Sequence, residues 1–184
     1  LLDRGDKVNE ILWFIYELEM QAKNAGGRVH YLLGNHEYMV LYNDLRYIHE
    51  KYNIASKLLN LEYDQLYGDN TIIGRWLRSK PTIVKINDII FTHGGISEDF
   101  ILYEGFNIEK INNTMRKSIP RLKELRNLRK KGQSKDVYNM YFGNNSLIWY
   151  RGYFEEGLID TDISNILKLI DANHIVVGHT SNKE

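Results

Sequence analysis

The sequence contains no cysteine among its 184 residues. Disulfides, thiolate metal sites and a cysteine nucleophile are therefore excluded, and any bound metal must use nitrogen and oxygen ligands. No apolar run approaches the roughly 20 residues that a membrane-spanning helix needs. The 24 basic and 24 acidic side chains cancel, so no overall field attracts the chain to nucleic acid or to a membrane surface.

Proline is also scarce, occurring only at Pro81 and Pro120, and no linker, repeat or low-complexity segment interrupts the chain. Hydrophobic residues make up 43% and charged residues 26%, which is typical of a globular protein. The length is that of one ordinary domain. We therefore predict a single domain over residues 1–184, with helical insertions around residues 38–80 and 98–146.

The first part of the chain predicts a helix followed by a strand. Asp6 is expected to cap a helix that starts near Val8, and Gly26-Gly27 is expected to end it. Residues 28–33 are rich in β-forming side chains and stop at Gly34. This order, followed by a polar loop, predicts an α/β fold with functional residues beyond the carboxyl end of the strand.

The same alternation continues further along. Residues 82–92 predict a β-hairpin that turns at Asn87-Asp88. Residues 107–135 are helical in pattern and increasingly basic, and residues 162–172 predict another helix. A strand is then expected at residues 174–177.

Three polar clusters follow the three predicted strands: Gly34-Asn35-His36-Glu37, His93-Gly94-Gly95 and Gly178-His179-Thr180. Strands of one sheet deliver their carboxyl-terminal loops to one edge, so these groups can converge. Imidazoles and an amide oxygen suit a divalent transition metal, and the glycines let the backbone turn sharply and leave room for a ligand. A single His at a strand end is more often a structural residue, but the ordered combination indicates a metal site.

These clusters, together with Asp3-Arg4-Gly5, resemble the motifs of the calcineurin-like metallophosphoesterases, and of their phosphoprotein phosphatase branch in particular. That family carries, in order, Asp-x-His, Gly-Asp-x-x-Asp-Arg-Gly, Gly-Asn-His-Glu, a His before Gly-Gly, and a late Gly-His. Residues 147–152 are similar to the Trp-Tyr-Arg segment of the bacterial, Shewanella-like group. The resemblance implies a metallophosphoesterase β-sandwich flanked by helices. We expect it to be incomplete at both ends. Asp-x-His and the first Asp of the second motif would precede Leu1, and the strands that normally follow the late Gly-His would come after Glu184.

The resemblance assigns Asn35, His93 and His179 as ligands of one metal ion. It further implies a centre of two divalent transition metal ions, with manganese, iron or zinc expected, whose second ion takes ligands from upstream of Leu1. In such a centre the ions lie roughly 3.5–4 Å apart, and a hydroxide between them attacks phosphorus in line.

Catalytic and phosphate-binding roles also follow from the resemblance. His36 is expected to be the general acid, and Asp3 is expected to orient it and raise its pKa. Arg4 and Arg151 are expected to bind phosphate oxygens, because guanidinium forks donate bidentate bonds without losing a proton. Glu37 is expected to support the loop rather than to bind metal.

The function predicted in this way is metal-dependent hydrolysis of phosphomonoesters by a protein phosphatase, on a phosphorylated protein or a small phosphomonoester. One alternative is a nucleotide or phosphodiester hydrolase with the same core. A second, from another class, is a catalytically inactive phosphopeptide-binding module. Neither a nucleic-acid partner nor a membrane span is expected. A cytoplasmic location is favoured, with the periplasm as the alternative if a leader preceded Leu1.

Several other features have simpler interpretations. Arg4-Gly5-Asp6 matches an adhesion tripeptide, but the catalytic motif and the cap expected at Asp6 explain it better. The basic stretch 121–135 is interpreted as a solvated amphipathic helix, with a docking or lid role as the alternative. His30 and His174 are expected to be core or edge residues, and His49 is expected on a helix surface. Four tyrosines after His36 could shape a substrate pocket or pack, and packing is favoured for most of them: Tyr38, Tyr42, Tyr47 and Tyr52.

Overall fold

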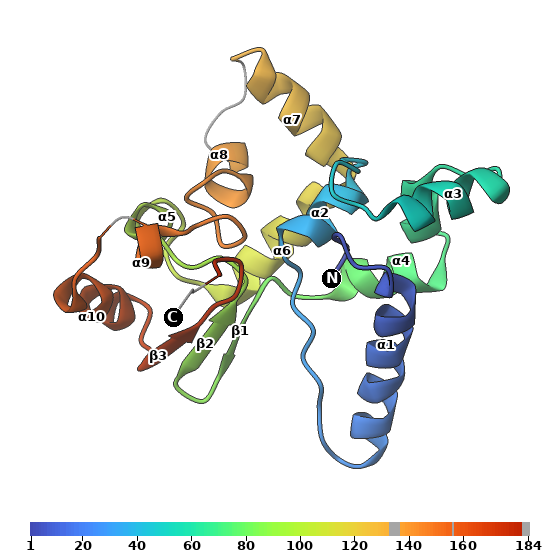
Figure 1. Ribbon diagram of the computed structural model, residues 1–184. Helices are drawn as coiled ribbons and strands as arrows, with labels where there is room; N and C mark the ends of the chain where they lie inside the picture. Colours follow the sequence, from blue (N-terminus) through green and yellow to red (C-terminus); the bar gives the residue numbers. More distant parts are fainter. Residues whose placement is uncertain (133–136, 156, 182–184) are drawn as a thin grey trace. The chain divides into compact units, whose positions relative to one another are not determined.

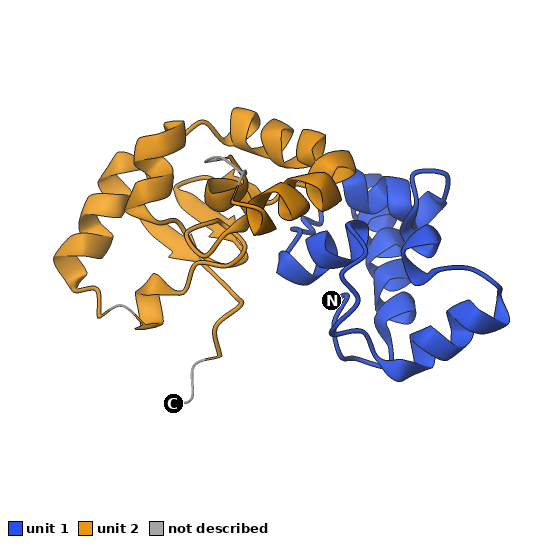
Figure 2. Ribbon diagram, turned by 90° about the horizontal axis from the view of Figure 1, so that it is seen from above, with its two compact units in different colours: residues 1–80 blue, residues 81–184 orange. Residues whose placement is uncertain are grey.

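A computed structural model describes residues 1–132, 137–155 and 157–181 of the chain. The chain divides into two compact units, residues 1–80 (unit 1) and 81–184 (unit 2), which Figure 2 shows in different colours. Each unit has its own buried side chains and is described by itself. The single domain expected over residues 1–184 stays a prediction.

Unit 1 is built from helices (Figure 1). Its elements are α1 (Val8–Asn24), α2 (Asn35–Leu41), α3 (Glu50–Leu58), the 3-10 helix η1 (Tyr63–Tyr67) and α4 (Ile72–Ser79). The core contains tyrosines as well as aliphatic side chains, and two of them, Tyr63 and Tyr67, form hydrogen bonds inside the unit. The hydroxyl oxygens of Tyr63 and Tyr67 lie 2.9 Å apart, and the Tyr67 hydroxyl donates to Asn9 Oδ1 at 2.8 Å. Burying these rings is favourable because each polar tip keeps a partner.

The first helix confirms the predicted end but not the predicted cap. Lys7, rather than Asp6, occupies the N-cap position, and no side chain among the described residues caps this helix. Asp6 lies one position too early to reach the free N–H groups of the first turn, so the cap prediction is wrong. At the other end Gly26 takes a left-handed φ of 77°, and the Gly27 N–H donates to the Ala22 carbonyl at 2.7 Å. A glycine in this conformation is a common way to end a helix.

The strand predicted at residues 28–33 is not formed. None of residues 1–80, all of which the structure describes, belongs to a strand. A strand needs a hydrogen-bonded neighbour, and unit 1 offers none. Side-chain packing holds the segment instead, because the Tyr31 ring stacks on Trp76 with centroids 5.1 Å apart and Leu33 is fully buried. His30, expected within this strand, is exposed.

Unit 2 contains a sheet of three strands, β1 (Ile83–Ile86), β2 (Ile89–Thr92) and β3 (His174–Val176), in the order β1-β2-β3 (Figure 1). The first two form the predicted antiparallel hairpin, with Asn87 at a φ of 55° in its turn. The third pairs parallel with β2, with Phe91 opposite Val176. The predicted α/β class is confirmed, and the described residues form one sheet.

The helices of unit 2 lie between the second and third strands in the sequence. They are α5 (Glu98–Glu104), α6 (Ile108–Ser118), the 3-10 helix η2 (Ile119–Arg121), α7 (Leu122–Lys130), α8 (Val137–Phe142), α9 (Gly152–Glu155) and α10 (Asp160–Leu169). The helical pattern predicted for residues 107–135 is therefore divided by the turn that contains Pro120, which cannot continue an α-helix. Residues 133–135 of that prediction lie outside the described residues.

A buried asparagine joins α6 to the sheet. Asn112 Oδ1 accepts from the backbone N–H groups of Thr82 and Ile83 at 2.8 and 3.2 Å, and Asn112 Nδ2 donates to the Ile83 carbonyl at 2.8 Å. The side chain thus acts as one more partner for the start of β1. Because buried backbone groups are costly to leave unpaired, this contact fixes where α6 packs.

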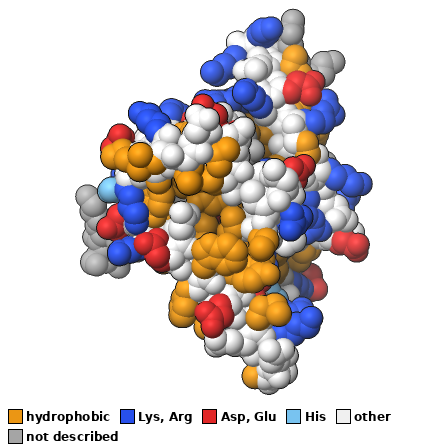
Figure 3. Space-filling model, turned by 90° about the vertical axis from the view of Figure 1, so that its right-hand side faces the viewer, with side chains coloured by type: hydrophobic (Ala, Val, Ile, Leu, Met, Phe, Trp, Pro, Cys, Tyr) orange, Lys and Arg blue, Asp and Glu red, His pale blue; other side chains and the backbone are white. Residues whose placement is uncertain are grey.

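Some apolar side chains of unit 1 stay exposed on its helices, among them Trp13 and Phe14 on α1 and Ile54 and Leu58 on α3. Hydrophobic side chains gather across the middle of the face drawn in Figure 3, with Lys and Arg side chains around them. The helices are amphipathic, and Leu12 and Tyr52 on α1 and α3 are buried. Over the described part of the chain, no helix combines the length and the apolar character needed to cross a membrane.

Candidate active site

His36 lies in the first turn of α2, beside the N-terminal segment of the chain. Gly34 precedes the helix in an extended conformation, and the next residue, Asn35, is 1% exposed. The His36 Nε2 atom is 3.5 Å from Asp3 Oδ2, and Arg4 Nε is 3.5 Å from Asp3 Oδ1. Unit 1 therefore brings together the predicted acid, its predicted partner and one predicted phosphate ligand.

The Glu37 carboxylate ties the two segments of this group to each other. Its Oε1 accepts from the Leu2 N–H at 2.9 Å, and its Oε2 accepts from the Gly34 N–H at 2.8 Å. Burial raises the pKa of Glu37, and the hydrogen bonds from the Leu2 and Gly34 N–H groups lower it. Glu37 thus holds the backbone just before Asp3 and just before the helix that carries His36. Its expected role as a supporting residue rather than a metal ligand stays a prediction.

The expected rise in the pKa of His36 is not found. Burial lowers the pKa of the imidazole, and this effect exceeds the opposite effect of the Asp3 and Glu37 carboxylates. Asp3 thus raises the pKa of His36 as predicted, but burial lowers it by more. The charged form loses hydration in a partly buried position, and one partner 3.5 Å away does not replace that hydration.

Tyr47, one of the tyrosines for which packing was favoured over a place in a substrate pocket, is a neighbour of this group. Its ring lies edge-on to the His36 imidazole, with centroids 5.1 Å apart. The guanidinium carbons of Arg4 and Arg46 are each 5.5 Å from the Tyr47 ring centroid. Tyr38 and Tyr52 are buried, as expected of packing residues, whereas Tyr47 contacts the predicted site.

Unit 2 brings together two of the predicted metal ligands at one edge of its sheet. His93 follows β2 directly and His179 follows β3, and these two strands are parallel neighbours. Because their carboxyl ends lie side by side, His93 Nε2 and His179 Nδ1 are only 3.2 Å apart. The Gly178 N–H donates to the His93 carbonyl at 2.9 Å, which joins the two loops, and the Trp149 ring lies edge-on to His179.

The two imidazoles suit a shared metal ion. Ligand nitrogens lie about 2.0–2.1 Å from a metal such as zinc, so two adjacent ones on one ion are roughly 2.8–3.4 Å apart, from octahedral to tetrahedral geometry. The observed separation of 3.2 Å falls within that range. Among residues 1–132, 137–155 and 157–181, no three His, Asp or Glu side chains group as metal ligands would. Asn35, the third predicted ligand, lies in unit 1 and stays a prediction.

Arg151 belongs to a segment that packs directly on the His93 loop. The Gly94 N–H donates to the Leu147 carbonyl at 2.7 Å, and Thr92 Oγ1 donates to the same carbonyl at 3.2 Å. A Cβ added at Gly94 would lie 2.9 Å from the backbone nitrogens of the two residues before Arg151. The space left by this glycine is therefore occupied by neighbouring backbone and not by a ligand. Arg151 Nη1 donates to Thr180 Oγ1 at 3.3 Å, which places its guanidinium beside the His179 loop.

Comparison with known proteins agrees with this arrangement. The family model for calcineurin-like phosphoesterases matches residues 1–182. The chain belongs to the calcineurin-like phosphoesterase family. Membership implies that divalent metal ions are bound, in agreement with the nitrogen and oxygen donors described above.

The calcineurin-like relatives include two curated phosphatases. Shewanella-like protein phosphatase 2 of Arabidopsis thaliana is 26% identical over 226 residues, which cover 98% of this chain and 55% of that protein. Shewanella-like protein phosphatase 1 of Plasmodium berghei (strain Anka) is 28% identical over 192 residues, which cover 98% of this chain and 49% of that protein. The chain thus spans about half the length of these relatives.

A solved structure is also similar. The cold-active protein-tyrosine phosphatase of a psychrophile, a Shewanella species, is 49% identical, and its crystal structure matches with a TM-score of 0.89. The match covers 98% of this chain and 52% of that one. At this identity the likeness extends to sequence as well as fold.

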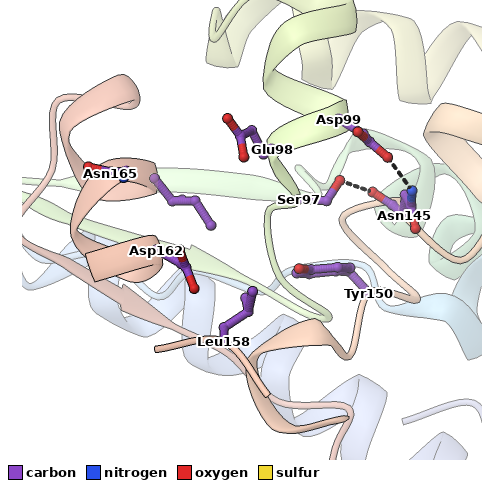
Figure 4. A pocket seen from close by; sticks show the side chains of 9 residues that line it. Ser97, Glu98, Asp99, Asn145, Tyr150, Leu158, Asp162 and Asn165 are labelled. Atoms are coloured by element: carbon purple, nitrogen blue, oxygen red, sulfur yellow. Dashed lines mark hydrogen bonds between the residues drawn. The ribbon is translucent and has the colours of Figure 1, made fainter. Parts of the chain in front are cut away.

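A cavity of about 380 Å³ lies beside the segment that carries Arg151, and no sequence motif had indicated it. Figure 4 shows Tyr150 and three carboxylates around it, from Glu98, Asp99 and Asp162. Asn145 Nδ2 donates to Asp99 Oδ2 at 2.8 Å. None of the described residues that line this cavity is basic, and neither His93 nor His179 is among them.

Proposed function

We propose that the protein containing this chain is a metal-dependent phosphatase that hydrolyses phosphomonoesters on proteins, with phosphotyrosine as the first substrate to test. The observation that carries the proposal is the pairing of His93 and His179. These residues are 86 positions apart in sequence, and their ring nitrogens are 3.2 Å apart, a hydrogen-bond separation that two ligands of one metal ion can also adopt. The names of the relatives support the choice of substrate, since all three are protein phosphatases.

In this proposal His93 and His179 hold one metal ion together with Asn35. When bound, such an ion supplies Lewis-acid chemistry, by polarising a phosphoryl oxygen and by making water a better nucleophile at neutral pH. A second divalent ion, with ligands outside this chain, completes the proposed centre. Manganese, iron and zinc all accept these nitrogen and oxygen donors.

The proton and the phosphate are handled by other side chains. His36 carries a proton on its imidazole and donates it to the departing ester oxygen, while Asp3, 3.5 Å away, orients the ring. Arg4 and Arg151 donate hydrogen bonds to phosphoryl oxygens. A bound phosphate dianion favours the charged imidazole, so substrate offsets the effect of burial on His36.

Phosphate release by the full-length protein tests the proposal. The substrates are peptides carrying phosphotyrosine, phosphoserine or phosphothreonine, compared with a panel of nucleotides and a phosphodiester. We expect turnover of at least one phosphopeptide, loss of turnover after chelation, and recovery when a divalent metal is restored. Turnover of nucleotides without peptides would refute the protein-phosphatase assignment, and peptide binding without turnover by metal-loaded protein would indicate a binding module.

A further inference from the structure

The Tyr47 ring connects the proposed reaction centre to a second cationic group. The ring contacts His36, the proposed proton donor, and Arg4, a proposed phosphate-binding residue. It also contacts Arg46, whose guanidinium carbon is 5.5 Å from the ring centroid, the same distance as that of Arg4. An aromatic ring attracts a guanidinium at such distances, so both cations are held near one ring.

Arg46 is held in place by a buried carboxylate. Its Nε and Nη2 atoms donate to Asp44 Oδ1 and Oδ2 at 2.7 and 2.8 Å, which is a bidentate arrangement. The Asp44 side chain is 2% exposed, whereas that of Arg46 is 60% exposed. Asp44 therefore fixes the guanidinium through two of its three nitrogens, while much of the Arg46 side chain faces solvent. A cation fixed in this way is ready to accept an anionic partner without further ordering.

We propose that Arg46 is a specificity-determining residue, which binds an acidic side chain of the substrate close to the phosphorylated residue. This inference rests on the proposed function and adds a preference among phosphopeptides. Since both guanidinium carbons are 5.5 Å from the same ring centroid, they are at most about 11 Å apart. An extended peptide advances about 3.3–3.6 Å per residue. With phosphate on Arg4, the acidic residue therefore lies within about three positions of the phosphorylated one.

The test compares kcat/KM for matched phosphotyrosine peptides that carry Glu, Gln or Lys at each of the three positions on either side of the phosphotyrosine. With wild-type full-length protein, we expect Glu at one of these positions to exceed Gln by about three- to fivefold, which is the upper range for a solvent-exposed ion pair. Lys at that position should be worse than Gln. The Glu-to-Gln ratio should fall toward one in high salt, because exposed charges are screened.

Two variants remove the cation in different ways. Arg46→Gln leaves Asp44 buried without its charged partner and could fail to fold. The double variant Asp44→Asn with Arg46→Gln replaces the ion pair by a neutral pair and keeps the measurement possible. In either, the Glu-to-Gln ratio should fall to about one. Arg75→Gln is the matched control, because it removes an exposed cation from the same unit, and it should keep the wild-type ratio.

Each outcome decides the inference. A Glu-to-Gln ratio lost in the Arg46 variants and kept in the Arg75 control supports it. A wild-type ratio near one at every position, or a ratio that survives the loss of Arg46, overturns the subsite and leaves the proposed function in place. If wild-type protein hydrolyses phosphoserine or phosphothreonine peptides instead, the same series is measured around that residue. If it hydrolyses no phosphopeptide of any of the three kinds, the proposed function itself fails, and the subsite fails with it.

Discussion

Gly94 lies where two segments of unit 2 meet with almost no space between them. An added Cβ would be 2.9 Å from the nitrogens of Trp149 and Tyr150 and 3.0 Å from the carbonyl carbon of Ile148. All three atoms belong to the backbone, so rotation of a side chain cannot relieve the clash. Gly94→Ala must therefore push the two segments apart and strain the bond from the Gly94 N–H to the Leu147 carbonyl.

The size of the effect follows from two opposed contributions. Overpacking of one methyl group typically costs about 1–3 kcal/mol, and a strained hydrogen bond adds to this cost. Alanine restricts the unfolded chain more than glycine does, which offsets about 0.4–1 kcal/mol. We expect Gly94→Ala to lower the free energy of unfolding by about 1–3 kcal/mol.

Gly178 provides a matched control in the other loop. A Cβ there would be 3.7 Å from His93 Nδ1 and from the His93 carbonyl oxygen, which is ordinary van der Waals contact. Gly178→Ala should therefore be neutral or slightly stabilising, by up to about 1 kcal/mol. The comparison isolates the backbone clash, because both substitutions add the same methyl group next to a predicted metal ligand.

Urea unfolding of the full-length variants, followed by far-UV circular dichroism, measures the difference. With a slope of about 1–3 kcal/mol per molar urea, the midpoint of Gly94→Ala should fall by roughly 0.5–2 M relative to Gly178→Ala. The Michaelis constant should also rise, because Arg151 follows the displaced segment. If Gly94→Ala is as stable as Gly178→Ala, the close approach of these two segments does not require glycine at position 94.

Three further variants of the full-length protein test other parts of the structure. His36→Ala should lower turnover by about 10²–10⁴-fold with metal content unchanged by elemental analysis, and loss of metal instead would make His36 a ligand. Arg151→Ala should raise the Michaelis constant for a phosphopeptide by about tenfold or more, because a charged hydrogen bond is lost, and unchanged kinetics would contradict the phosphate-binding role. Asn112→Ala should lower the free energy of unfolding by about 2–4 kcal/mol in urea titrations, since the N–H groups of buried residues Thr82 and Ile83 lose their side-chain acceptor. A loss below about 0.5 kcal/mol would show that water replaces Asn112.

The parts of the fold that the sequence predicted correctly depend on neighbouring residues. The hairpin could be located because Asn87-Asp88 is a local turn signal between two apolar runs. The end of α1 could be located because Gly26 adopts a conformation that few other residues tolerate. The interruption between α6 and α7 has an equally local cause in Pro120, although the periodicity had suggested one continuous segment.

The failures concern contacts between distant residues. Residues 28–33 have strand-like composition, but composition does not supply the partner strand that pairing requires. The approach of residues 148–150 to Gly94 has no periodicity that a sequence could reveal. Tyr47 looked like any other packing tyrosine, because its position beside His36 depends on how α2 and the following loop fold back together. In the candidate site, motifs located the chemistry, whereas the surroundings of each group came from tertiary structure.

The late position of β3 in the chain has a consequence for the order of folding. Its three residues pair with residues of β2 that lie about 85 positions earlier in the chain. Among the described residues, β2 is the strand with which β3 pairs. Closing so long a loop is entropically unfavourable, so this pairing should form after the local hairpin. An ion held by both imidazoles would link the ends of the two strands and oppose their separation. Metal loading should then slow amide hydrogen exchange in β3 more than in β1, so that the step that creates the site also secures the last strand of the sheet.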